Sequence, residues 1–167
     1  MPAARNDETS PAVENDLGAP ISPLADEYIA VLVLSLAARL NRGASSYYLR
    51  HFNIGMADFR IVMALGLVKG LNVGELATAA DIDKAAASRS LKFLQSCGLV
   101  ELEQTATRGR AAIVHLTDQG RAFQRKLNQA ARRREKRLLA AFSEAERAQA
   151  AAILRKLIAG VANMNRE

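Results

Sequence analysis

Apolar residues recur at helical spacing in the first third of the chain. They repeat every four residues from Leu24 to Leu40, which predicts a long helix over residues 24–50. Further apolar residues widen this face, so we expect burial on more than one side, as at a subunit interface. A second helical pattern runs from Gly55 to about Val68, where a Lys-Gly pair ends it.

Two short helices with a tight turn between them are predicted next. Asn72 and Glu75 have the spacing of a capping box, with Asn in place of the usual Ser or Thr. Asp83 is placed to cap the following helix, which runs to about Ser96 and is stopped by Gly98. Helix, turn and helix are therefore expected in immediate succession.

The pattern then changes to the alternation that is typical of strands. Residues 99–103 alternate between apolar and polar, and residues 111–116 form a second β-prone run. The polar loop 104–110 between them contains a glycine flanked by two arginines. A β-hairpin with a basic tip is predicted.

Long helices are predicted for the remainder of the chain. Thr117 can cap a helix that continues to about Phe142, and Ser143 with Glu146 forms another capping box before a last helix. Together the elements predict a mainly α fold with a small β-hairpin wing. In this fold a winged helix-turn-helix over about residues 55–120 lies between N- and C-terminal helices.

Composition divides the 167-residue chain into two parts. All four prolines lie within the first 23 residues, and residues 1–20 hold four acidic residues against one arginine, a net charge of −3. We expect residues 1–23 to form a disordered tail and residues 24–167 a single domain. The whole chain carries +6, so the part after residue 20 carries +9. A positive excess of this size is typical of a protein that binds a polyanion, usually nucleic acid. In the alternative interpretation it serves solubility alone.

Composition also indicates the cellular compartment in which the protein works. No apolar run approaches the roughly 18 residues of a membrane span, and acidic residues occupy the N-terminal region where a secretory signal would be apolar. Cys97 is the single cysteine, which excludes a disulfide within the chain and agrees with a reducing compartment. We expect a cytoplasmic protein without a membrane partner.

Three segments carry a family resemblance. Residues 72–94, the Cys-Gly-Leu-Val run at 97–100 and the Val-His-Leu-Thr-Asp-Gln-Gly run at 114–120 resemble the MarR family of bacterial regulators. The resemblance extends over nearly the whole chain after the tail. It implies an obligate homodimer formed by dimerisation helices at residues 24–50 and 117–165. It also implies binding to a palindromic operator in double-stranded DNA, usually with repression that a small molecule often relieves.

The helix after the turn is the predicted DNA-reading element. In a helix-turn-helix this second helix lies in the major groove with its N-terminal residues against base edges. Basic and hydroxyl side chains, Ser90 included, can meet phosphates or base edges, and small residues allow close approach. In the alternative interpretation this face is only solvated, and Arg89 pairs with an acid. The predicted contacts, wing included, are Lys84, Ala86, Ser88, Arg89, Lys92, Arg108 and Arg110.

The predicted wing departs from the family pattern. Arg108, Gly109 and Arg110 stand where relatives commonly have Asp-Arg-Arg or Asp-x-Arg, so the acid that usually orients the wing arginine is missing. Arg110 matches the family arginine, whereas Arg108 is supported by its charge and position. The dense basic run at residues 132–137 is interpreted as a solvated helix face.

The resemblance also implies an effector pocket between the first two helices and the DNA-binding lobe. Arginine together with aromatic side chains can hold an aromatic carboxylate, through guanidinium pairing and ring stacking. Alternatively the aromatic residues are core and the arginines form internal ion pairs. The candidates are Arg39, Tyr48, His51, Phe59, Arg60 and Met63.

Catalytic, cofactor and metal sites are not predicted. Neither His51 nor His115 has an acid at a spacing that suggests a triad or a metal site, and no Gly-rich phosphate loop is present. Cys97 is expected to be a buried small hydrophobe; the alternative is a redox-sensing regulator that uses its thiol. A further alternative is a winged-helix protein-interaction module without operator binding.

Overall fold

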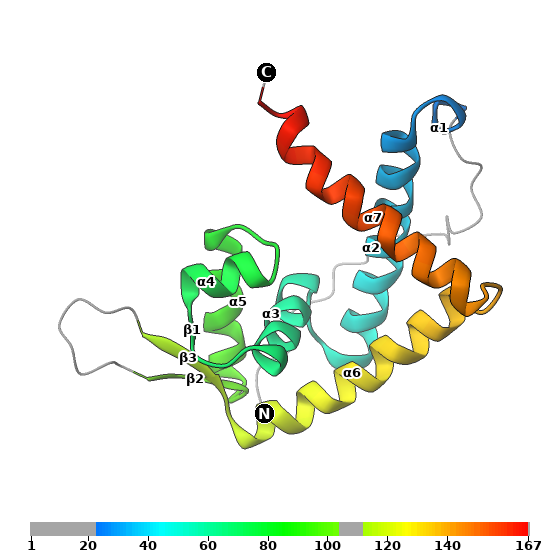
Figure 1. Cartoon of the computed structure of the whole chain (residues 1–167). Helices are drawn as coiled ribbons and strands as arrows, with labels where there is room; N and C mark the ends of the chain where they lie inside the picture. Colours follow the sequence, from blue (N-terminus) through cyan, green and yellow to red (C-terminus); the bar gives the residue numbers. More distant parts are fainter. Residues whose placement is uncertain (1–22, 104–111, 167) are drawn as a thin grey trace, which may run out of the picture. The chain divides into compact units, whose positions relative to one another are not determined.

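The computed structural model describes residues 23–103 and 112–166. The predicted wing tip with Arg108 and Arg110, and nearly all of the predicted tail, lie outside these residues. The contacts divide the chain into two units, of which the first ends at Phe59 and the second begins at Arg60. Each unit is described by itself, with the element labels of Figure 1.

The first unit is helical. α1 spans Leu24–Glu27 and α2 spans Ile29–Phe52, so the single helix predicted over residues 24–50 is broken near its start. Tyr28 makes the break with an extended backbone, φ −125° and ψ 110°. α2 ends at Asn53, whose φ of 55° is left-handed. Neither glycine nor proline marks the break at Tyr28, which is why the apolar pattern runs through it.

The second unit contains the helix-turn-helix and the strands. Starting from α3, whose first turn belongs to the first unit, the elements are α3 (Met56–Leu67), β1 (Leu71–Asn72), α4 (Val73–Ala79), α5 (Lys84–Ser96), β2 (Val100–Glu103), β3 (Ile113–Leu116), α6 (Asp118–Leu138) and α7 (Glu144–Met164). Capping boxes form at Asn72 and Ser143 as predicted. The mainly α winged helix-turn-helix fold is confirmed.

The strands form a three-stranded antiparallel sheet rather than a two-stranded hairpin. β3 lies in the middle and pairs with β2 on one side and β1 on the other. Val100 lies opposite Leu116, and Leu71 lies opposite Val114. β1 has only two residues and its partner strand lies far along the chain, so no local alternation reveals it.

The core of the second unit draws on α3, α4, α5, β3 and α6. Its largest fully buried side chains are Ile61, Val62, Leu76, Leu94, Val114 and Leu127. Burying a side chain of this size contributes about 1.5–3 kcal/mol relative to leaving it exposed. The helix-turn-helix is therefore held by the same core that supports the sheet.

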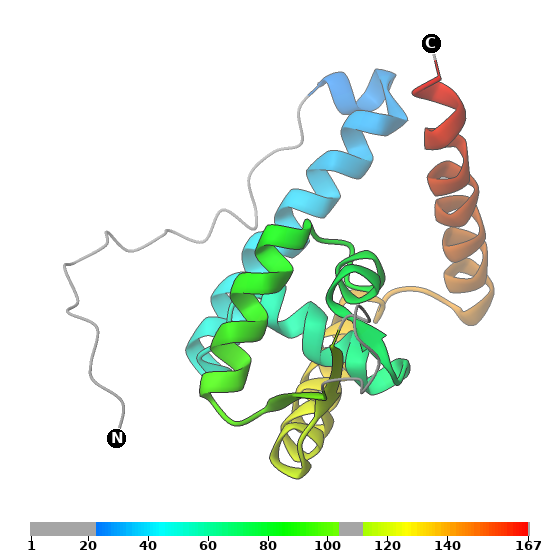
Figure 2. The same cartoon turned by 90° about the vertical axis from the view of Figure 1, so that its left-hand side faces the viewer.

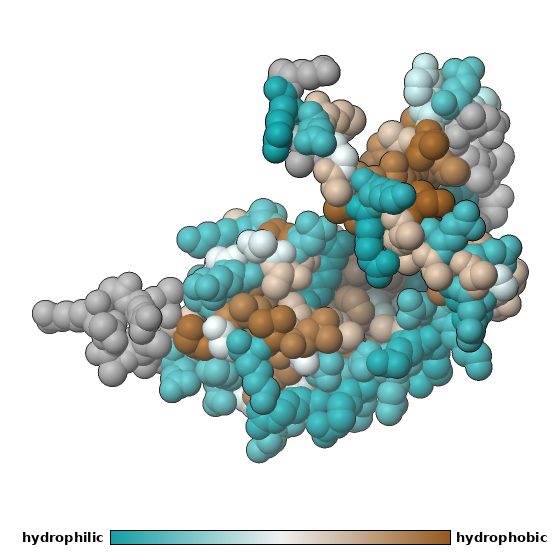
Figure 3. Space-filling model, viewed as in Figure 1, coloured by the Kyte–Doolittle hydropathy of each residue, from teal (hydrophilic) through white to brown (hydrophobic). Residues whose placement is uncertain are grey.

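α2 and α7, in contrast, keep many apolar side chains at the surface. Figure 3 shows brown, apolar side chains exposed along α2. The exposed large apolar residues include Ile29, Leu32, Leu36 and Leu40 on α2, and Ile153, Leu154, Leu157, Ile158, Val161 and Met164 on α7. Exposed apolar surface of this extent indicates an interaction site. In the described part of the chain, no helix combines the length and apolar character needed to cross a membrane.

Candidate nucleic-acid interface

α5 is the second helix of the helix-turn-helix, and Figure 2 shows it in green, leading down into β2. Asp83 caps its first turn by accepting a hydrogen bond from the Ala86 N–H at 2.7 Å. Ala87, Leu91 and Leu94 are buried on its inner face. Because a helix repeats every 3.6 residues, Arg89 and Lys92 lie on the opposite, outward side.

The outward face carries the predicted DNA contacts of this helix. Lys84, Arg89 and Lys92 are exposed, and Ala86 and Ser88 are half-buried. Lys84, Ser88 and Lys92 recur at four-residue steps and form one row along the helix. The Ser88 hydroxyl donates to the Lys84 carbonyl at 2.9 Å, and its oxygen can still accept a hydrogen bond. The structure thus brings the predicted contacts of α5 together on one element.

Two sequence expectations for α5 are wrong. Ser90 is only 6% exposed, because it lies in the inner row of the helix, so it is not available to DNA. Cys97 is exposed, because it is the C-cap residue and lies beyond the part of the helix that packs on the core. It is therefore not the buried hydrophobe that the apolar pattern predicted.

The turn before α5 is held by its own backbone and by a side chain of α3. Asp81 has a left-handed φ of 52°, and the Ile82 N–H donates to the Ala77 carbonyl at 3.0 Å, which closes the end of α4. Arg60 Nη1 donates to the Asp81 carbonyl at 2.8 Å and lies 3.9 Å from Asp81 Oδ2. The turn and α3 are thereby linked directly.

The other end of α5 is tied to the start of α6. Gly98 ends the helix with a left-handed φ of 69°. The Thr117 hydroxyl donates to the Gly98 carbonyl at 2.7 Å and accepts from the Gly120 N–H at 2.9 Å. Gly120 lies so close to the Leu99 carbonyl that any β-carbon there would overlap it. α5 is therefore anchored at both ends within the second unit.

The sheet presents an acidic face. Glu101 lies opposite His115, and Glu103 Oε2 is 3.1 Å from His115 Nε2. With Leu102 these residues line a surface cavity of about 350 Å³. No local pattern in the sequence indicates this cluster, because its members come from two strands. Carboxylates repel phosphates, so this face does not suit DNA. Among the residues that the structure describes, no three His, Cys, Asp or Glu side chains are grouped to hold a metal ion.

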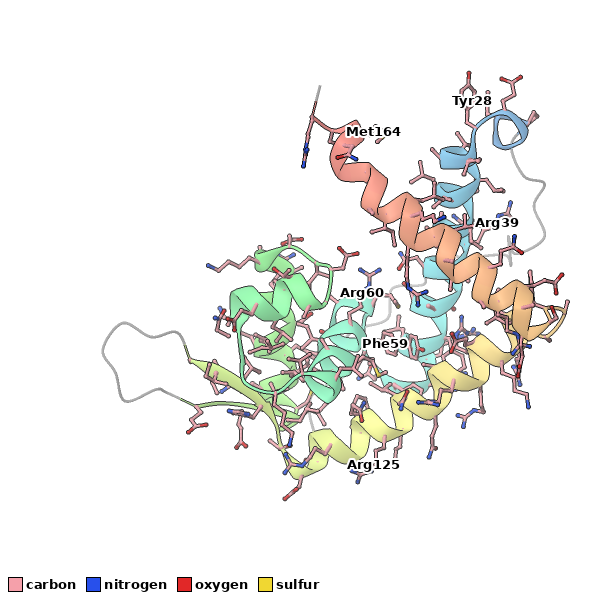
Figure 4. All side chains as sticks on the ribbon, in the orientation of Figure 1. Tyr28, Arg39, Phe59, Arg60, Arg125 and Met164 are labelled. Atoms are coloured by element: carbon pink, nitrogen blue, oxygen red, sulfur yellow. The ribbon has the colours of Figure 1, made fainter. Side chains whose placement is uncertain are left out.

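Part of the predicted effector set lies in the first unit. The buried Tyr48 ring stacks on the Phe59 ring with 4.1 Å between centroids and 21° between planes. The exposed His51 ring lies 4.4 Å from the Tyr47 ring. Arg39 is half-buried on α2 (Figure 4). The end of α2 therefore forms an aromatic cluster.

The other two candidates lie on α3 in the second unit. Arg60 is committed to the turn contact with Asp81, and Met63 is half-buried. Contact of any of the six candidates with an effector stays a prediction. A carboxylate that pairs with Arg60 would have to compete with the Asp81 carbonyl.

Known proteins resemble this chain in sequence and in structure. A profile of the MarR family matches residues 52–111. The crystal structure of a MarR/EmrR family transcriptional regulator from Acinetobacter sp. ADP1 is 30% identical in sequence, aligns over 83% of this chain and 97% of that one, and has a TM-score of 0.76. The chain belongs to the MarR family.

Other solved proteins share the fold. A MarR family transcriptional regulator from Silicibacter pomeroyi is 27% identical over 81% of this chain and 91% of that one, with a TM-score of 0.70. MepR of S. aureus, solved in complex with DNA, is 20% identical over 80% of this chain and 98% of that one, with a TM-score of 0.72. This last likeness concerns the fold alone. No curated protein sequence matches the chain.

Proposed function

We propose that this MarR protein is a dimeric DNA-binding transcriptional regulator that represses a small operon from a palindromic operator. The observation that carries the proposal is the exposed basic face of α5, which is anchored at both ends. The net charge of +6 favours a polyanionic partner. MepR, which shares the fold, has been solved with DNA bound.

In the proposed complex α5 lies in the major groove. Lys84 and Lys92 meet phosphates and hold the register, while Arg89 reads a base edge, for which a guanine suits a guanidinium best. The small residues between them let the helix approach closely. Arg108 and Arg110, in the loop between β2 and β3, extend the contact to the backbone or the minor groove. Such a regulator works in the cytoplasm, where the DNA lies.

A second copy of the chain is the proposed occupant of the exposed apolar faces of α2 and α7. Ile29 is 65% exposed and Ile158 is 73% exposed, and such surface is costly to leave in water. A two-fold dimer places two recognition helices roughly 34 Å apart, in successive major grooves, which matches a palindromic operator. Sedimentation analysis of the full chain measures the dimer directly.

The proposed effector is a small aromatic carboxylate that relieves repression by lowering DNA affinity. The aromatic cluster at the end of α2, with Arg39 on the same helix, supports this chemistry. A thermal-shift series with phenolic and indolic acids tests it, because a ligand that binds the folded state raises its melting temperature. If no acid shifts the melting temperature, the effector proposal fails and the DNA proposal stands.

The DNA proposal is tested by fluorescence anisotropy with duplexes from the protein's own promoter region and with scrambled duplexes. We expect Arg89→Ala to cost about 1–3 kcal/mol of selective binding, about ten- to a hundredfold in affinity. Arg125→Ala, on the exposed face of α6 (Figure 4), is the charge-matched control. Circular dichroism should remain helical for both variants. Absence of selective binding by the wild type contradicts the proposal, and absence of any salt-dependent DNA affinity favours a protein-interaction module instead.

A further inference from the structure

Arg60 on α3 contacts the turn before α5 and is not one of the predicted DNA contacts. We infer that Arg60 is a positioning residue: it holds the turn before α5 and thereby sets the angle at which α5 meets DNA. The inference rests on the proposed DNA-binding function. It does not require Arg60 to touch DNA or an effector.

The turn at Asp81 has a strained backbone, so a hydrogen bond from another element stabilises it. Asp81 adopts a left-handed φ of 52°, which residues with a β-carbon disfavour, although Asp tolerates it better than most. Within the turn, the Asp81 N–H donates to Thr78 and the Ile82 N–H donates to Ala77, at 3.1 and 3.0 Å. These bonds use the N–H groups, whereas the Asp81 carbonyl accepts from Arg60.

α3, which carries Arg60, is packed into the core at both residues that follow it. Ile61 and Val62, which follow Arg60 directly, are both 0% exposed in the core, so the helix that carries the guanidinium cannot shift easily. The hydrogen bond of 2.8 Å to the carbonyl is charge-assisted. The Asp81 carboxylate is fully exposed and lies at 3.9 Å, so it adds little in water. The carbonyl is therefore the main partner.

A change at the turn acts on selectivity more than on general DNA affinity. α5 is 13 residues long, so a rotation at its N-terminal turn displaces Arg89 and Lys92, which lie further along the helix. Base contacts depend on this geometry, whereas phosphate contacts with flexible lysines tolerate small displacements. Loss of the Arg60 contact should therefore reduce the ratio of operator affinity to scrambled-duplex affinity.

The test compares full-length Arg60→Gln with Arg125→Gln, which removes the same charge from the exposed face of α6. For Arg60→Gln we expect operator affinity to fall about five- to tenfold, because operator binding must then order a turn that Arg60 no longer holds. Affinity for scrambled DNA should change less than about twofold relative to the control. Arg60→Lys, which keeps one donor, should recover part of the ratio. Without DNA, hydrogen exchange across residues 78–84 should be faster in Arg60→Gln than in the control.

A wild type that binds no DNA selectively overturns the proposed function and this inference with it. A selective wild type whose ratio is unchanged in Arg60→Gln overturns this inference alone, as does unchanged hydrogen exchange across the turn. Equal losses on both duplexes, together with a lowered unfolding midpoint, would show that Arg60 serves only stability.

Discussion

The helix-turn-helix and the last helix, α7, are both built from regular helix but are stabilised in different ways. Leu76 and Leu94, in α4 and α5, are 0% exposed in a shared core. On α7, Leu157 is 39% exposed and Ile158 is 73% exposed. The helix-turn-helix is therefore held by tertiary packing, whereas α7 leaves many of its apolar residues exposed.

Local bonds define where α7 begins. Ser143 N–H and Oγ both donate to Glu146 at 2.7 Å, and Arg147 donates to the carbonyls of Phe142 and Leu139 at 3.0 and 2.9 Å. These contacts cap the helix and order the turn before it. Local capping thus defines the start of α7, whereas its apolar face is buried only if a partner covers it.

The largest expected difference comes from the same substitution made in both regions. Leu94→Ala should lower the free energy of unfolding by about 3 kcal/mol, through lost burial and a residual cavity. Leu157→Ala should lower it by only about 1 kcal/mol at protein concentrations that keep the chain monomeric, because this side chain is already 39% exposed, yet weaken dimerisation. Urea unfolding and sedimentation measure the two effects. Equal losses of stability in the monomer would show that α7 is packed as tightly as the helix-turn-helix.

Two glycines of the second unit differ in what surrounds them. Gly120→Ala places a β-carbon on the Leu99 backbone carbonyl, so we expect a loss of about 2–3 kcal/mol, as for overpacking. Gly66→Ala meets only the side chain of Gln124, which can move. Its stability should stay within about 1 kcal/mol of the wild type, because Ala also favours helix. Thermal unfolding compares them; a harmless Gly120→Ala would contradict the close approach.

The two capping boxes test whether local bonds matter equally in both regions. Asn72→Ala and Ser143→Ala each remove a cap worth about 1 kcal/mol. The first should lower the global unfolding free energy, since α4 is part of the core. The second should mainly speed hydrogen exchange in the first turn of α7. Similar global losses for both variants would mean that α7 unfolds together with the core.

The smallest expected effect concerns pH. Hydrogen bonds from the Ser143 side chain and backbone hold the pKa of Glu146 below its ordinary value of 4.5. This contribution is present above pH 4.5 and is lost as pH falls through the lowered pKa. Glu146→Gln should therefore reduce the acid sensitivity of α7 helicity, measured by circular dichroism from pH 6 to about 3. An unchanged titration would contradict the role of the carboxylate.

Much of the site followed from local sequence signals. Asn72, Asp83 and Thr117 cap helices as predicted, and Gly98 ends α5 with a positive φ. The outward row of α5 followed from helical period alone. The same period misplaced Cys97, because a period does not say where the packed face ends. For Ser90 it was the hydroxyl group that suggested a DNA contact, although a position three residues after Ala87 belongs to the inner row.

Sequence patterns alone predicted the caps, the basic face of α5 and the order of the elements, apart from β1 and the break at Tyr28. These features depend on neighbouring residues, so the pattern contains them. Only the tertiary structure decided the pairing of β1 with β3, the contact of Glu103 with His115 and the bond from Arg60 to Asp81. Each joins segments that are distant in sequence, and such contacts arise only when the core forms and brings the segments together.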